Sequence, residues 1–129
     1  MATVFIQFAA FNGLLAVVLG AFGAHALKAR LTTEMLSTYE TAVQYHFYHS
    51  LALLAVGILA YQLPNSRLLT GSGIAFSIGI VLFSGSLYLL ATTTLRYIGA
   101  FPVGIITPLG GLCFIAGWAL LLATSFTLK

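Results

Sequence analysis

The chain has 129 residues, of which 60% are hydrophobic and 5% are charged, and its mean hydropathy is +1.08. A soluble domain carries roughly a quarter charged residues, so this chain cannot cover a water-facing surface and its main solvent must be lipid. The formal charge of +3 rests on five basic residues spread thinly along the sequence, which excludes a nucleic-acid partner. The length predicts one domain, 1–129.

The first apolar stretch, 4–24, is long enough to cross a bilayer, which takes about 20 residues. No Lys or Arg precedes it and it is longer than the apolar part of a signal peptide, so we expect a retained membrane helix. Ala16, Gly20 and Ala24 recur every four residues. Small residues at this spacing let helices approach closely in lipid, so Gly20 and the nearby Gly23 are predicted packing positions.

A polar segment, 25–44, separates this span from the next. Thr32 or Thr33 could cap a helix that begins near Thr33 with Glu34 in its first turn, and the stretch Ser37-Thr-Tyr-Glu40 fits the capping-box pattern. The helix should then enter the membrane as span 45–63 and end at the turn that begins with Pro64.

Two further apolar stretches predict spans 68–91 and 105–127, the second with Pro108 either starting the regular helix or kinking it. Serines at membrane depth usually bond back to their own helix or across to a neighbour. The polar residues predicted at membrane depth are Ser84, Ser86, Tyr88 and Thr107. The glycines predicted to pack helices here are Gly85, Gly110, Gly111 and Gly117. Cys113 is alone, so it is expected to be a small buried hydrophobe.

Four spans joined by short loops predict an all-α, antiparallel four-helix membrane bundle. Its expected partners are the lipid bilayer and, through exposed glycine stripes, a second copy or another membrane protein. The sequence contains no nucleophile-base-acid set, no phosphate-cradling glycine loop and no paired catalytic carboxylates. We therefore do not expect an enzyme.

The three histidines, both acidic residues and most of the tyrosines lie in one part of the chain. On a helical wheel, Tyr39 and His49 fall within about 60° of His46, whereas Gln44 and Tyr48 fall on the opposite side. His25 ends the preceding helix on the same side of the membrane. The residues of this expected interfacial layer are His25, His46, His49, Tyr39, Tyr45 and Glu40.

Three functions are compatible with such a layer. Histidines can tether helices by hydrogen bonding, which makes a structural or accessory membrane protein the leading interpretation. Imidazoles also bind transition metals and haem iron, so a haem, metal or quinone module is the second interpretation. Proton or small-solute permeation is the third. The residues do not specify a cofactor.

Four motifs occur in order along nearly the whole chain. They are Gly20-Ala-Phe-Gly-Ala-His25, Tyr45-x-x-x-His49, Leu82-Phe-Ser-Gly-Ser-Leu-Tyr88, and Ile106-Thr-Pro-Leu-Gly-Gly111 through Gly117-Trp118. This set resembles the small bacterial inner-membrane proteins of domain-of-unknown-function family 423, which is similar to the eukaryotic transmembrane protein 256. The resemblance implies a four-span inner-membrane protein whose biochemical function is not established.

The resemblance also bears on the histidines and on orientation. The family position that corresponds to His46 is usually glutamine, which leaves His25 and His49 as the pair expected to meet and, if a metal is bound, to hold it. Relatives tend to have basic C-terminal tails, which implies that Arg67, Lys129 and both termini face the cytoplasm.

Overall fold

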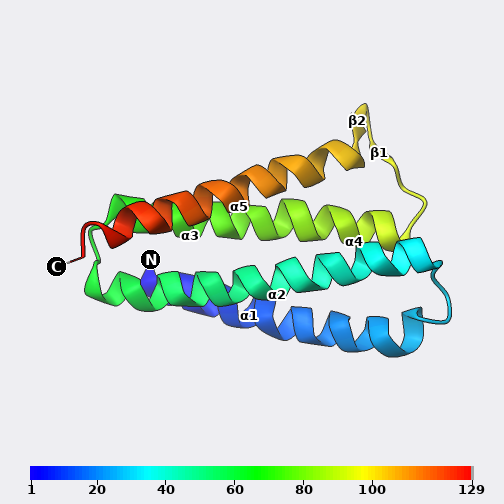
Figure 1. The fold of residues 1–129 in the computed structure, drawn as a ribbon, viewed down its shortest axis with the longest axis horizontal. Helices are drawn as coiled ribbons and strands as arrows, with labels where there is room; N and C mark the ends of the chain where they lie inside the picture. Colours follow the sequence, from blue (N-terminus) through cyan, green and yellow to red (C-terminus); the bar gives the residue numbers. More distant parts are fainter. Residues whose placement is uncertain (129) are drawn as a thin grey trace.

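The computed structural model describes residues 1–128 and consists of long helices that run side by side (Figure 1). Two of the long helical spans contain a single π-helical turn, η1 or η2. The elements in chain order are α1 (Ala2–Phe22), η1 (Gly23–Leu27), α2 (Thr33–Gln62), α3 (Arg67–Gly79), η2 (Ile80–Ser84), α4 (Gly85–Thr92), β1 (Tyr97–Ile98), β2 (Phe101–Pro102) and α5 (Val103–Ser125).

The four predicted membrane spans are confirmed, because four helical stretches are long and apolar enough to cross a bilayer. The predicted start of the second helix near Thr33 is also confirmed. Of the two predicted capping residues, Thr32 caps α2, because its hydroxyl accepts a hydrogen bond from the Met35 amide at 3.2 Å. The capping-box pattern at 37–40 lies inside this helix and does not cap it. Pro108 lies inside α5, so it does not start that helix.

The helices run alternately up and down, with both ends of the chain at the same end of the molecule (Figure 1). Cross-helix bonds agree with this direction: Thr3 meets Tyr61 at 3.1 Å, and the Tyr39 hydroxyl donates to the Leu19 carbonyl at 2.5 Å. The first span packs mainly on α2, and α5 packs mainly on α3 and η2. Helices α1 and α5 therefore each turn a wide apolar face toward lipid.

The apolar core lies toward the end of the molecule that holds the termini. Leu53, Val56 and Phe76 are fully buried there, and Phe5 from α1 reaches the same cluster. The aromatic rings fit where a neighbouring helix has no side chain, since a Cβ at Gly73 would collide with the Phe5 ring. At the opposite end, β1 and β2 form a two-residue hairpin that the sequence did not predict, with Gly99 at φ 61° in its turn.

The predicted packing glycines divide into two groups. A Cβ at Gly20 would meet Val43, a Cβ at Gly23 or Gly117 would overlap an aromatic ring, and a Cβ at Gly110 would overlap the Phe83 backbone. These glycines are used inside the chain, which corrects the expectation that they form stripes free for partner helices. Gly85 and Gly111 have no such close neighbour.

The adjacent glycines of α5 give a matched test of this packing. A methyl group at Gly110 would lie 2.7 Å from the Phe83 Cα, whereas one at Gly111 would lie 3.8 Å from the Phe83 ring. We expect Gly110→Ala to lower the free energy of unfolding by about 1–3 kcal/mol, because backbone cannot move aside as a side chain can.

Gly111→Ala is the control and should leave stability nearly unchanged. Both variants can be measured by denaturant titration in detergent micelles, followed by circular dichroism. Equal stability of the two variants would contradict the close approach of α5 to Phe83.

Candidate functional site

The polar face of α2 is turned inward. His46, His49 and Ser50 are buried, whereas Gln44 and Tyr48 are exposed, which agrees with the helical wheel. The two histidines lie near the middle of α2, where they bond to Asn12 of α1 and Trp118 of α5.

His46 is the centre of a hydrogen-bond chain across three helices. The Asn12 amide nitrogen donates to the Phe8 carbonyl at 2.8 Å, which turns the Asn12 carbonyl oxygen toward His46. That oxygen accepts from His46 Nε2–H at 3.0 Å, and His46 Nδ1 then accepts from the Tyr88 hydroxyl at 3.0 Å. The partners therefore select a neutral imidazole that carries its proton on Nε2, with both nitrogens bonded.

His49 has the opposite tautomer. Its Nδ1–H donates to the Tyr45 carbonyl at 2.7 Å, and its Nε2 accepts from the Trp118 indole N–H at 3.1 Å. The imidazole also stacks on Phe114, with ring centroids 3.5 Å apart and an interplanar angle of 9°. His49 thus links α2 to α5, and no ring nitrogen is left for another ligand in this arrangement.

His25 does not meet His49, which corrects the predicted pair. His25 is exposed in η1, beyond the point where Gly23 packs on Tyr39. His49 lies about 15 Å further along α2 from Tyr39, at 1.5 Å per helical residue. No group of three metal-binding side chains comes together within residues 1–128. The donor set therefore does not fit a metal or haem shared by these two histidines.

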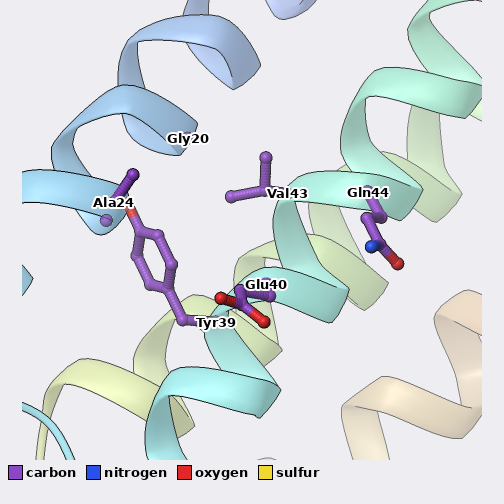
Figure 2. A pocket seen from close by; sticks show the side chains of 7 residues that line it. Gly20, Ala24, Tyr39, Glu40, Val43 and Gln44 are labelled. Carbon is purple, nitrogen blue, oxygen red and sulfur yellow. The ribbon is translucent and has the colours of Figure 1, made fainter. Parts of the chain in front are cut away.

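A small hollow lies between the end of the first span and the start of α2 (Figure 2). Its volume is about 170 Å³, and its walls are Gly20, Gly23, Ala24 and Val43, with Tyr39 reaching across to the first helix beside Ala24. Pockets for small molecules typically measure about 300–1,000 Å³. Glu40 at its rim is exposed and brings the only carboxylate, so this hollow is explained by packing around Tyr39.

The intramembrane hydroxyls predicted from the sequence are nearly all bonded. Ser86 donates to the Phe83 carbonyl at 2.9 Å and meets Thr107 at 2.5 Å, which joins α4 to α5. Ser84, in η2, is the exception: its hydroxyl is buried without a partner among residues 1–128.

Three important residues were missed as site candidates. They are Asn12, which bonds to His46, Trp118, which bonds to His49, and Ser72, which donates to the Gly117 carbonyl at 2.8 Å. A polar group in the middle of an apolar run is the signal that could have identified all three, because lipid offers such a group no partner.

Comparison with known proteins agrees with the membrane architecture. The chain is 46% identical over 122 residues to the UPF0382 membrane protein YwdK of Bacillus subtilis, covering 95% of each chain. It is 42% identical over 122 residues to the UPF0382 inner membrane protein YgdD of Escherichia coli K12, covering 95% of this chain and 88% of that one. No solved structure shows significant similarity. Residues 19–111 match the family described as "Protein of unknown function (DUF423)", and the chain belongs to this family of membrane proteins.

Proposed function

We propose that the chain is a non-enzymatic structural or accessory component of the inner membrane, whose histidines hold its helices in register. The observation that carries this proposal is that every ring nitrogen of His46 and His49 is bonded within the chain. The bonds reach α1, α4 and α5 from α2, so this helix is bonded to each of the other three membrane spans.

The membrane environment supports this role. Hydrocarbon contains no water to replace a lost hydrogen-bond partner, so a buried polar chain favours one arrangement of the helices. The Tyr39 ring adds an edge-on contact with Tyr88, with centroids 5.4 Å apart. These contacts extend the His46 network toward the loop between the first two spans.

The alternative functions have less support. A haem or metal module needs a free imidazole nitrogen, and His49 could supply one only by giving up its bond to Tyr45 or Trp118. Permeation needs a continuous polar path. Beyond His46 and His49, toward the termini, the core consists of Phe5, Leu53, Val56 and neighbouring apolar side chains.

We also propose that both termini and the Arg67 loop face the cytoplasm. The support is the family's tendency to have basic C-terminal tails, together with the position of both termini at one end of the bundle (Figure 1). Lys129, which contributes to this argument, lies outside the described residues. Lys28, Arg30 and Arg96 would then lie on the outer side.

Orientation can be measured with single cysteines. In a Cys113→Ser background, Asn65→Cys lies in the loop before α3 and Thr94→Cys lies in the loop after α4. A membrane-impermeant maleimide added to intact spheroplasts should label Thr94→Cys and leave Asn65→Cys unlabelled until the cells are lysed. The reverse pattern would overturn the proposed orientation.

The tethering role predicts a specific stability loss. His46→Leu should lower the free energy of unfolding by about 1–3 kcal/mol, because it leaves the Asn12 carbonyl and the Tyr88 hydroxyl without partners. In a double-mutant cycle with Tyr88→Phe, the coupling energy should be about 0.6–1.7 kcal/mol, as for hydrogen bonds between membrane helices.

Two variants control this measurement. His46→Gln should recover much of the loss, because an amide can donate to Asn12 and accept from Tyr88. His25→Leu should change stability by less than about 0.5 kcal/mol, because His25 is exposed and has no side-chain bond within residues 1–128. If His46→Leu were as stable as the parent protein, the tethering role would be wrong.

A direct comparison separates tethering from cofactor binding. Gently extracted protein should show no haem absorbance and no stoichiometric transition metal by mass spectrometry. Added haem or zinc should bind the parent protein and the His49→Ala variant to the same extent. A stoichiometric cofactor that is lost in His49→Ala would favour the redox or metal module instead.

A further inference from the structure

A groove between α2 and α5 is not explained by the tethering role. Its volume is about 620 Å³, and rings form most of its surface. We call it the aromatic groove; its main lining residues are Tyr45, Tyr48, His49, Phe83, Phe114 and Trp118.

The groove exists because α5 packs mainly on α3 and η2, leaving aromatic side chains to fill the space toward α2. Tyr45 lies 4.7 Å from Phe83 and Phe83 lies 5.4 Å from Phe114, measured between ring centroids. Gly111 also lines the groove, and a Cβ there would meet only the Phe83 ring, at 3.8 Å. A larger side chain at Gly111 would occupy the groove itself.

The groove is accessible from the bilayer. Its outer residues are strongly exposed, with Ile115 at 66%, Tyr48 at 55% and Trp118 at 49% of their full accessible surface. His49 and Phe114 at its inner side are buried and lie near the middle of their helices. A ligand would therefore enter sideways from lipid, at the depth of the hydrocarbon chains.

The chemistry of the lining restricts the ligand. No charged residue lines the groove, so a charged ligand would have no counter-charge at this depth. The hydroxyls of Tyr45 and Tyr48 make no hydrogen bond to any residue in the described chain, although an unpaired hydroxyl is unfavourable in hydrocarbon. A complementary ligand is therefore neutral and carries oxygen atoms that accept hydrogen bonds.

From these observations we infer that the aromatic groove binds a neutral, lipid-soluble molecule with a planar ring and carbonyl oxygens, the chemical class of the isoprenoid quinones. The ring would pack against the exposed faces of Tyr45 and Trp118, as aromatic rings favour, and a carbonyl would accept from a tyrosine hydroxyl. The volume is in the range of small-molecule pockets. The inference concerns binding alone, without electron transfer, and extends beyond the structural role.

Two other occupants fit less well. The methylene part of a phospholipid chain, which lies at this depth, would fill the space but offer no acceptor to the two hydroxyls. A helix of a second copy would present a backbone whose carbonyls are already bonded within that helix. The proposal therefore commits to the ring-bearing lipid, and the experiment distinguishes it from both.

Trp118 makes the site directly observable, because it is the single tryptophan of the chain and lines the groove. The probe is decylubiquinone, added to the protein in nanodiscs of uniform phospholipid. It should quench Trp118 fluorescence along a saturable curve. Gly111→Leu should weaken binding about tenfold or more by filling the groove. Tyr45→Phe and Tyr48→Phe, which keep the rings, should weaken it roughly two- to tenfold.

The matched control is Gly13→Leu, because Gly13 lies in α1 and has open space where a side chain would be added. It should bind the quinone as the parent protein does. Three outcomes would overturn the proposal. The first is quenching that rises linearly with quinone concentration and is equal in all variants. The second is that decanol, which has the chain without the ring, displaces the quinone as well as unlabelled quinone does. The third is that the parent protein forms a dimer in nanodiscs and Gly111→Leu does not, which would assign the groove to a second copy.

The tyrosine variants keep the test decisive if Gly111→Leu does not fold. Unchanged quinone affinity in the combined Tyr45→Phe and Tyr48→Phe variant would refute the predicted hydrogen bonds and with them the choice of ligand. Normal circular dichroism and an unshifted Trp118 emission maximum in that variant would show that the bundle itself is intact.

Discussion

The hydrogen bond from His46 to Asn12 reflects the constraint on which the structure depends: lipid cannot satisfy a polar group, so the chain must. Asn12 has two polar ends and uses one on its own helix and one on α2. His46 passes the pairing on to Tyr88, on α4. A shift of α2 would leave Asn12 and Tyr88 without a bond, and a shift of α1 or α4 would leave one nitrogen of His46 unpaired, so this chain of bonds couples the helix positions to one another.

Packing follows a second rule, in which rings and glycines face each other across helix pairs. The Tyr39 ring occupies the space above Gly23, the Phe114 ring occupies that above Gly79, and the Phe76 ring occupies that above Gly117. Lipid gives no hydrophobic drive for helices to associate, so close contact of this kind must supply much of the attraction. These three glycines are therefore part of the interior of a single chain, whereas larger aliphatic residues such as Val17 and Leu112 face lipid.

The sequence predicts the four spans and the buried face of α2 well, because both depend on patterns repeated within one helix. It does not predict which level of one helix meets which level of the next. The pattern therefore favours His25 beside His49, although the pairing of Gly23 with Tyr39 puts His25 near the first residues of α2. Asn12 was overlooked for a related reason, since a single residue has no periodicity and its importance depends on a partner in another span.

His46 and His49 lie one turn apart on α2, and they have opposite tautomers and different roles. His46 is enclosed by Asn12 and Tyr88, so its ring has no side open to lipid or to the aromatic groove. His49 is equally buried, but its ring lines the groove and fixes the orientation of Trp118 there. The first histidine can hold the bundle without contributing to a ligand site. The second contributes to both, because the bond that ties α2 to α5 also shapes the groove between them.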